Sequence, residues 1–155
     1  MTAEYVNPFI NSTVNVISTM CSVSPIPGTP SEKQGHYTWG IVTGIIGLAG
    51  SETKGNMMLS FDQPCVLDLV SKMLMEEHTS LTQDVLDAVG ELTNIITGGT
   101  KKVLAELGLV IDMSTPIVFS GQGIAIQQIS ETPIITIPFK TPAGRFVIET
   151  NLTKR

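Results

Sequence analysis

The sequence predicts an α+β fold in which helices pack on a mostly antiparallel sheet, in the order α-β-β-α-α-β-β-β. Three features predict it: helical spacing of apolar residues near the N-terminus, a long helical pattern in the middle of the chain, and short apolar runs between glycine and proline turns in the last third. Of the 155 residues, 42% are hydrophobic and 15% charged. Residues 1–155 are therefore expected to form a single domain with a sizeable core.

The N-terminal segment predicts a helix over roughly residues 8–21. Asn7 would be its N-cap and Pro8 would lie in its first turn. Its apolar stripe consists of Ile10, Val14, Ile17 and Cys21. Residues 24–31, rich in proline and serine, are typical of a surface connection.

The next segment predicts a β-hairpin followed by a short helix. Apolar runs near residues 41–46 and 57–59 flank residues 51–55, which have the composition of a hairpin turn. A short helix is expected after Pro64. Its apolar face would consist of Val66, Leu69, Val70 and Met73.

The second half of the chain predicts one long helix and then strands. Residues 80–83 match a capping box, and the apolar pattern continues to Leu107, with Gly108 as the expected end of the helix. Such a helix, over residues 81–107, would be roughly 40 Å long. Strands are expected at 117–119, 123–129, 133–139 and 145–150, with a turn at residues 141–144.

Charge and composition narrow the classes of function. Nine Lys+Arg against fourteen Asp+Glu give a net charge of −5, which argues against nucleic acid or anionic lipid as the main partner. The longest weakly polar run, residues 41–50, is too short to cross a bilayer, and the N-terminus lacks signal-peptide features. Cys21 and Cys65 are isolated among apolar residues, as buried thiols in a reducing compartment are. We expect a cytoplasmic protein.

Common catalytic constellations are poorly matched. His36 and His78 lack ligand-like spacing to each other or to a cysteine, so no metal site is expected. Residues 121–123 fit a hairpin turn better than a dinucleotide fingerprint, and residues 98–101 lack the spacing of a phosphate loop. Ser120 has neither a nucleophile elbow nor a histidine partner. Catalysis by a nucleophile or metal of the chain's own is therefore disfavoured.

The long helix carries a polar face. Taking Asp87 as zero and about 100° per residue, Glu91 falls near 40° and Asn94 near −20°. The same window holds Gln83, Asp84, Gly98, Lys101 and Lys102. The opposite side holds Leu81, Val85, Ala88, Val89, Leu92, Ile95, Ile96, Val103 and Leu107. This face is either simply solvated or a binding face.

Two glycines interrupt this helix, although glycine costs roughly 1 kcal/mol against alanine at such a position. Gly98 follows Asn94 by one turn on the polar face. It either gives clearance to a docking partner or is merely tolerated. Gly99 points to the apolar side, where close approach of helix and sheet is a sufficient reason.

The segment Asp87-Ala-Val-Gly-Glu91-Leu-Thr-Asn94-Ile-Ile-Thr-Gly98 resembles the CheC/CheX/FliY family of chemotaxis phosphatases. The family pattern is an acidic residue or serine, a glutamate, an asparagine and a downstream proline. Asp87, Glu91, Asn94 and Pro116 fill these places, with a final gap one residue shorter than the usual pattern. The opening residues 7–11, the element order and the length are most similar to CheX.

Members of this family often carry the pattern twice. Laying Asn15 on Asn94 puts Ser12 in the place of the glutamate and Pro8 in the place of the acidic residue. The first copy is therefore degenerate, as in CheX-like members with a single site.

The resemblance implies a phosphatase that acts on a phosphorylated CheY-like response regulator. The phosphoryl group and a Mg²⁺ would both be held by the regulator, so the chain would need no cofactor of its own. Glu91 would pair with the active-site lysine of the regulator, and Asn94 would hold the attacking water in line with the phosphorus. Asp87, Gly98 and Lys101 are weaker candidates for docking contacts.

Other functions and assemblies stay open at this point. The alternative is a non-catalytic interaction module of the same fold that binds a regulator or another signalling protein. A metabolic enzyme or small-molecule binder would need a site that the sequence does not show. The resemblance also favours a homodimer formed by sheet edges, for which the apolar strands 134–139 and 146–150 are candidates.

Overall fold

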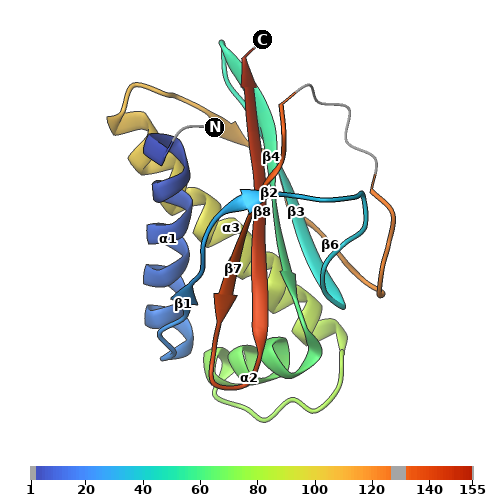
Figure 1. The fold of residues 1–155 in the computed structure, drawn as a ribbon. Helices are drawn as coiled ribbons and strands as arrows, with labels where there is room; N and C mark the ends of the chain where they lie inside the picture. The colour runs from blue at the N-terminus through green and yellow to red at the C-terminus, as the bar shows by residue number, and fades with distance from the viewer. Residues whose placement is uncertain (1–2, 127–131, 155) are drawn as a thin grey trace.

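The computed structural model, which describes residues 3–126 and 132–154, is a layer of helices on one face of an antiparallel sheet (Figure 1). Its helices are α1 (Ala3–Cys21), α2 (Gln63–Leu74) and α3 (Gln83–Glu106). Its strands are β1 (Ile26–Pro27), β2 (Ser31–Glu32), β3 (Val42–Ala49), β4 (Thr53–Phe61), β5 (Asp112–Met113), β6 (Ile117–Ser120), β7 (Ile135–Lys140) and β8 (Arg145–Lys154). The predicted α+β class is confirmed.

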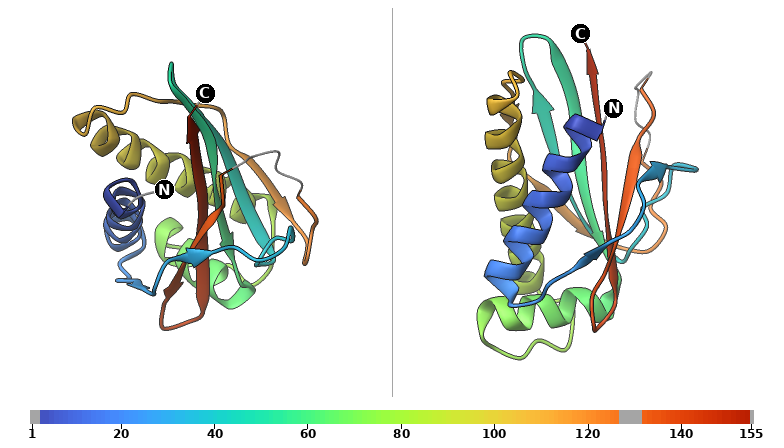
Figure 2. Two further views of the ribbon diagram at one scale, coloured as in Figure 1. Left: turned by 45° about the horizontal axis from the view of Figure 1, so that its top comes forward. Right: turned by 60° about the vertical axis from the view of Figure 1, so that its left-hand side comes forward.

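The strands of the described chain form one sheet in the order β1-β7-β8-β4-β3-β5, with β2 also beside β7 and β6 also beside β3. Every pairing is antiparallel. Figure 2 shows α1 and α3 side by side on one face, while the segment that leads from β2 to β3 crosses the other face.

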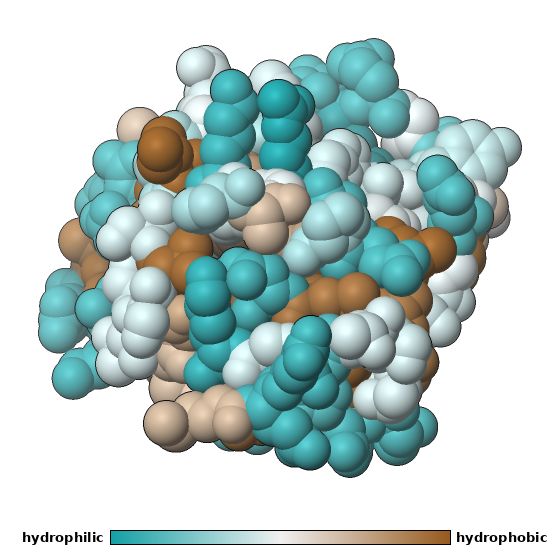
Figure 3. All heavy atoms as spheres, turned by 90° about the horizontal axis from the view of Figure 1, so that it is seen from below, coloured by the Kyte–Doolittle hydropathy of each residue, from teal (hydrophilic) through white to brown (hydrophobic). Residues whose placement is uncertain are grey.

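Seen from below, over α2, the surface has an apolar strip between polar side chains (Figure 3).

A single hydrophobic core fills the space between helices and sheet. Its aromatic centre is formed by Phe61, Phe139 and Phe146, with ring centroids 5.3 Å apart for the first and last and 4.8 Å apart for the last two. The predicted apolar face of α2 is confirmed, because Val66, Leu69 and Val70 are fully buried and Met73 is partly buried. Burial of such side chains stabilises the fold by roughly 1.5–3 kcal/mol each.

Both predicted hairpins are present. In the first, the Gly50 amide donates to the Thr53 carbonyl at 2.7 Å, so the turn lies at residues 50–52, slightly before the predicted one. In the second, the Thr141 amide donates to the Gly144 carbonyl at 2.8 Å, as predicted. The sequence did not predict the two-residue strands β1, β2 and β5, because so short an element has no readable alternation.

The predicted start of α1 is wrong. The helix begins at Ala3, so Asn7 is not its N-cap and Pro8 lies inside it. Proline at this position, in the second turn, removes one hydrogen bond of the helix backbone. Of the predicted stripe, Ile17 and Cys21 are fully buried, whereas Ile10 and Val14 are only partly buried.

The predicted capping box of α3 is also wrong. The helix begins at Gln83 with Thr82 as N-cap, and no side chain caps it. Leu81 and Leu86, at the two positions of a hydrophobic staple, both pack against the core and set where the chain enters the helix. The predicted end is confirmed: Gly108 has φ of 90°, and the Leu109 amide donates to the Leu104 carbonyl at 2.9 Å, as in a Schellman motif.

The buried side of α3 differs from the predicted one in the second half of the helix. Val103 and Leu107 are 38% and 41% exposed, although they were predicted to lie on the buried side. The buried positions there include Thr97, Thr100 and Leu104. This part of α3 contacts both layers, since Thr97 Oγ1 donates to Met57 Sδ of β4 and Gly99 faces Ser12 of α1. The threonines satisfy their hydroxyls by donating to carbonyls four residues earlier in the helix.

The strands predicted as dimer edges are not free edges. β8 lies between β4 and β7, and the outer side of β7 pairs with β1 and β2. The amides of Gly28 and Lys33 donate to the carbonyls of Pro138 and Ile134, so this side of β7 is paired almost throughout. A homodimer itself stays a prediction.

The strand predicted over residues 123–129 falls partly outside the described residues. Of the predicted strand 123–129, only a bridge between Ala125 and Tyr37 is present, and residues 127–129 lie outside the described residues.

None of the helices in the described ranges is long and apolar enough to span a membrane.

Candidate functional site

An open groove of about 500 Å³ runs between the first half of α3 and the start of β6. It brings together residues that are far apart in the sequence, because α3 and β6 both pack against β3. Its lining consists of Gln83, Leu86, Asp87, Gly90, Glu91, Asn94, Pro116 and Val118. All four places of the family pattern therefore border one groove.

The polar side of the groove is carried by successive turns of α3. Asp87, Glu91 and Asn94 are all exposed, and their spacings of four and three residues place neighbouring Cβ atoms about 5–6 Å apart. The Gln83 Nε2 donates a 2.8 Å hydrogen bond to Asp87 Oδ1. Within residues 3–126 and 132–154, the side chains of Glu91 and Asn94 have no hydrogen-bond partner.

The floor of the groove is apolar and close to the helix backbone. A Cβ at Gly90 would lie 3.3 Å from Val118 Cγ2 of β6. One turn further on, Thr93 packs directly over Gly44 of β3, where a Cβ would overlap the threonine hydroxyl. These two glycines let α3 lie close to the sheet, which fixes the position of the polar side chains relative to Pro116.

Gly98 and Lys101, the other predicted docking residues, do not line the groove. A Cβ at Gly98 would have no atom within 4 Å, so the space beside this position on the helix surface is open. The Lys101 Nζ lies 3.5 Å from Asp112 Oδ1 in an exposed pair. Gly99, in contrast, faces Ser12 of α1, so its absent side chain serves helix–helix packing and not the predicted helix–sheet packing.

The degenerate first copy has no carboxylate to offer. Ser12, in the place of the glutamate, is buried and donates to the Ile96 carbonyl at 2.7 Å. Asn15 is exposed on α1, but no acidic side chain precedes it at the expected spacing. The complete set of side chains therefore occurs on α3.

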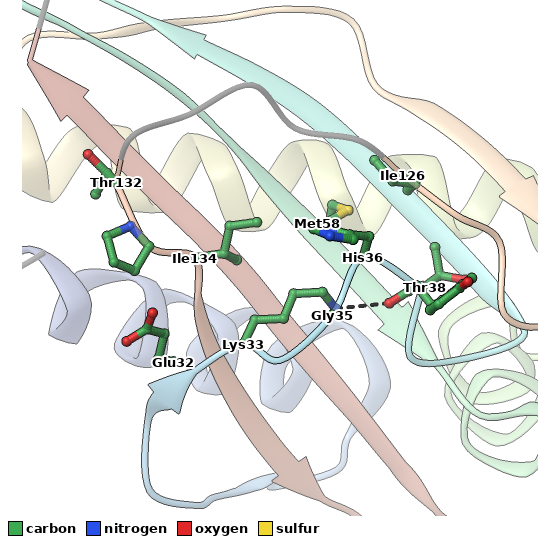
Figure 4. A pocket seen from close by; sticks show the side chains of 11 residues that line it. Glu32, Lys33, Gly35, His36, Thr38, Met58, Ile126, Thr132 and Ile134 are labelled. Carbon is green, nitrogen blue, oxygen red and sulfur yellow. Dashed lines mark hydrogen bonds between the residues drawn. The ribbon is translucent and has the colours of Figure 1, made fainter.

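A second cavity, of about 220 Å³, lies on the opposite face of the sheet (Figure 4). Its cation, Lys33, is already paired: Nζ lies 2.7 Å from Glu149 Oε1 and donates at 3.0 Å to the Tyr37 carbonyl, the bond drawn in Figure 4. The side chains of Lys33 and Glu149 are only 10% and 3% exposed. This ion pair is part of the packing between the β2–β3 connection and the sheet.

The two cysteine thiols are buried and do not line the groove, and the described residues offer no cluster of metal ligands. Burial raises the pKa of Cys21 to about 11 and that of Cys65 to about 12, so both thiols stay protonated at neutral pH. Among residues 3–126 and 132–154, no group of three or more His, Cys, Asp or Glu side chains is arranged to hold a metal ion.

Leu86, Gly90 and Val118 were missed from the sequence as parts of the site. Gly90 carries a readable signal, since a glycine inside a helix is costly and lies between two residues of the pattern. Val118 carries none, because its position depends on how β6 pairs with β3.

Comparison with known proteins identifies the family. The model described as "Chemotaxis phosphatase CheX" matches residues 42–140. The chain belongs to this CheX family. A CheX-family relative, the CheY-P phosphatase CheX of Thermotoga maritima, is 30% identical over 128 residues, which are 82% of this chain and 82% of the relative.

Solved structures of the family share the fold. The chemotaxis protein CheX from Vibrio vulnificus has a TM-score of 0.91 and 42% identity, and the match covers 97% of this chain and 100% of that chain. The CheX of the CheX-CheY-BeF3-Mg+2 complex from Borrelia burgdorferi has a TM-score of 0.78 and 29% identity, with 97% of each chain covered. The predicted resemblance and the CheX-like fold are confirmed.

Proposed function

We propose that this chain hydrolyses the aspartyl phosphate of a CheY-like response regulator, with Glu91 and Asn94 of α3 as the groups that enter the regulator's site. The observation that carries the proposal is the groove between α3 and β6, which places Asp87, Glu91, Asn94 and Pro116 side by side. Two relatives support it: one is named a CheY-P phosphatase, and another is a CheX in complex with CheY.

Glu91 suits the docking role. Its carboxylate is exposed and has no cationic partner in the described parts of the chain. A lysine of the regulator's site would supply the missing charge, and the charge-assisted bond would fix the orientation of α3 in that site. The proposed role of Glu91 is therefore to orient the complex, not to take part in bond making.

Asn94 suits the positioning of water. It lies one turn after Glu91 on the same face, and its amide is unoccupied by the described residues. An amide both accepts and donates hydrogen bonds and does not titrate, so it can hold a water molecule at any physiological pH. Phosphoryl transfer depends mostly on positioning and charge stabilisation, and a single well-placed group has a large effect on its rate.

The proposed reaction balances without a base from this chain. The water oxygen forms a bond to phosphorus as the bond between phosphorus and the aspartyl oxygen breaks. The aspartate leaves as a carboxylate, and both water protons end on the released phosphate as H₂PO₄⁻. We expect Mg²⁺ on the regulator, where it would neutralise phosphoryl charge, and the presence of Mg²⁺ in the Borrelia complex supports this.

The remaining docking candidates have lesser roles in this proposal. Gly98 and Lys101 would border the contact surface beyond Asn94, since both lie outside the groove. Asp87 would border the groove at its other end. We place the reaction in the cytoplasm.

The test is the decay of aspartyl phosphate on a purified CheY-like regulator, with and without this protein. We expect faster decay with the wild-type chain and a loss on the order of 10²-fold with Asn94→Ala. The matched control is Asn15→Ala, the same change at an exposed asparagine of α1, which should leave the rate unchanged. Binding without faster decay would favour a non-catalytic interaction module, and a fully active Asn94→Ala protein would contradict the mechanism.

A further inference from the structure

The proposed reaction involves only two of the residues that line the groove between α3 and β6, Glu91 and Asn94. Glu91 and Asn94 are exposed on its rim, whereas the half-buried Leu86, Gly90 and Val118 form its inner part, with the exposed Asp87 beside them. A partner whose site receives α3 must therefore also place something over this inner part, or leave it as an unfilled gap. The chemistry of its walls indicates what fits.

The walls combine an apolar floor with one fixed anionic end. The floor consists of aliphatic side chains and the half-buried backbone at Gly90, where an added Cβ would point toward Val118. At the end of the groove, Asp87 accepts a hydrogen bond from Gln83 through Oδ1, which orients its carboxylate. Asp87 has no cationic partner among the described residues.

A side chain that satisfies both features has an aliphatic stem and a cationic end. The methylenes of lysine or arginine can lie along apolar surface while the charged group stays at a polar edge. A purely apolar side chain would partly desolvate the Asp87 carboxylate without supplying a counter-charge. An anionic side chain would be repelled by it. Charge complementarity thus selects one class of occupant.

We propose that the inner groove receives a lysine or arginine side chain of the regulator, distinct from the lysine that pairs with Glu91, with its stem over Gly90 and its charge at Asp87. This inference rests on the proposed phosphatase function and adds a specificity contact to it. A regulator without a basic residue at this place is a poorer substrate. Asp87 then contributes to recognition and not to the chemical step.

The first experiment compares Asp87→Asn with Asp84→Asn. Both change one exposed carboxylate to an amide, and the two positions lie one turn apart on α3, but only Asp87 lines the groove. Because neighbouring charges contribute almost equally to long-range attraction, a difference between the variants reports direct contact. We expect Asp87→Asn to raise the KM for phosphorylated regulator about fivefold with little change in kcat, and Asp84→Asn to raise it less than about twofold.

The second experiment fills the groove. Gly90→Leu places an aliphatic side chain on the floor, and Ala105→Leu adds similar bulk at an exposed position near the end of the same helix. We expect the first to raise KM and the second to have no effect. If Gly90→Leu impairs folding by circular dichroism, Gly90→Ala provides the smaller obstruction.

The outcomes separate this inference from the proposed function. If the wild-type chain accelerates decay and Asn94→Ala does not, but the two aspartate variants have equal KM values, the occupant of the groove is not cationic and the inference is wrong. Equal KM values for wild type, Gly90→Leu and Ala105→Leu would show that nothing enters the groove. If no regulator is dephosphorylated, the proposed function fails first.

Discussion

The Ser12 hydroxyl of α1 donates a 2.7 Å hydrogen bond to the Ile96 carbonyl of α3. The bond lies where the two helices cross, and Gly99 of α3 faces the same hydroxyl without a side chain. The crossing therefore depends on a small residue from each helix. It also explains why two adjacent glycines of α3 have different roles.

The two glycines should respond oppositely to alanine. Gly99→Ala forces a Cβ against the Ser12 hydroxyl, and we expect it to lower the free energy of unfolding by about 1–3 kcal/mol. Gly98→Ala meets no atom within 4 Å, and we expect it to raise that free energy by up to about 1 kcal/mol through better helix propensity. Urea unfolding of both variants checks this, and equal shifts would contradict the assigned packing.

Restoring the glutamate of the degenerate copy should not restore a site. Ser12→Glu would bury a carboxylate between α1 and α3 without a cationic partner, so we expect it to destabilise the fold by at least about 3 kcal/mol. Unfolding by urea measures the loss. A stable Ser12→Glu protein with enhanced phosphatase activity would show that α1 can move away from this crossing.

Local patterns predicted the elements more successfully than their contacts. The end of α3 follows from Gly108 alone, since the left-handed backbone there suits glycine, and the β7–β8 turn follows from residues 141–144. The pairing of β7 with β1 and β2 could not be predicted, because it joins segments more than one hundred residues apart. The same holds for the pairing that brings β6 beside α3.

The site was predictable to the extent that it lies on one helix. Helical periodicity placed Asp87, Glu91 and Asn94 on one exposed face, as the structure has them. Periodicity failed for Val103 and Leu107, because the buried side of the second half of α3 passes through Thr97, Thr100 and Leu104 instead. The apolar floor of the groove belongs to tertiary packing and has no local signal.

Glu91 should act on complex formation more than on the bond-breaking step. With Glu91→Gln, we expect the KM for phosphorylated regulator to rise about tenfold, since a charge-assisted bond across the interface is lost, and kcat to fall less. The matched control is Glu106→Gln, at an exposed glutamate in the last turn of α3 outside the groove. An unchanged KM for Glu91→Gln would remove the glutamate from the docking contacts.

The buried ion pair of Lys33 and Glu149, on the face of the sheet away from the helices, should contribute to stability but not to phosphatase activity. Lys33→Met leaves the Glu149 carboxylate, 3% exposed, without its cation, and we expect a loss of about 3–5 kcal/mol in unfolding free energy. The exposed pair of Lys72 and Asp68 provides the control, since Lys72→Met should cost less than about 1 kcal/mol.

The double variant Lys33→Met with Glu149→Gln makes this test sharper. It removes both charges, so part of the stability lost in Lys33→Met should return. Phosphatase activity should be unaffected at temperatures where the variants are folded, because Lys33 lies on one face of the sheet and the helices cover the other face (Figure 4). A loss of kcat in a folded variant would instead indicate coupling between the two faces.

The two buried thiols should make stability fall at alkaline pH. Burial raises the pKa of Cys21 to about 11 and that of Cys65 to about 12, from 9.0 for an unperturbed thiol. Between pH 9 and 11 the unfolded chain therefore releases these protons while the folded chain retains them. Because the unfolded state then binds fewer protons, the free energy of unfolding decreases as pH rises, by at most about 1.4 kcal/mol per pH unit for each thiol.

Urea unfolding between pH 8.5 and 10.5 measures this slope, and cysteine variants isolate the contribution of each thiol. Cys65→Ala removes one ionisable group, so its stability should decline less steeply with pH than that of the wild type, even though cavity formation lowers its stability at every pH. Lysine and tyrosine titration is common to both proteins and cancels in the comparison. Parallel pH profiles for the two proteins would show that the Cys65 thiol ionises equally in the folded and unfolded states, against its complete burial in the first turn of α2.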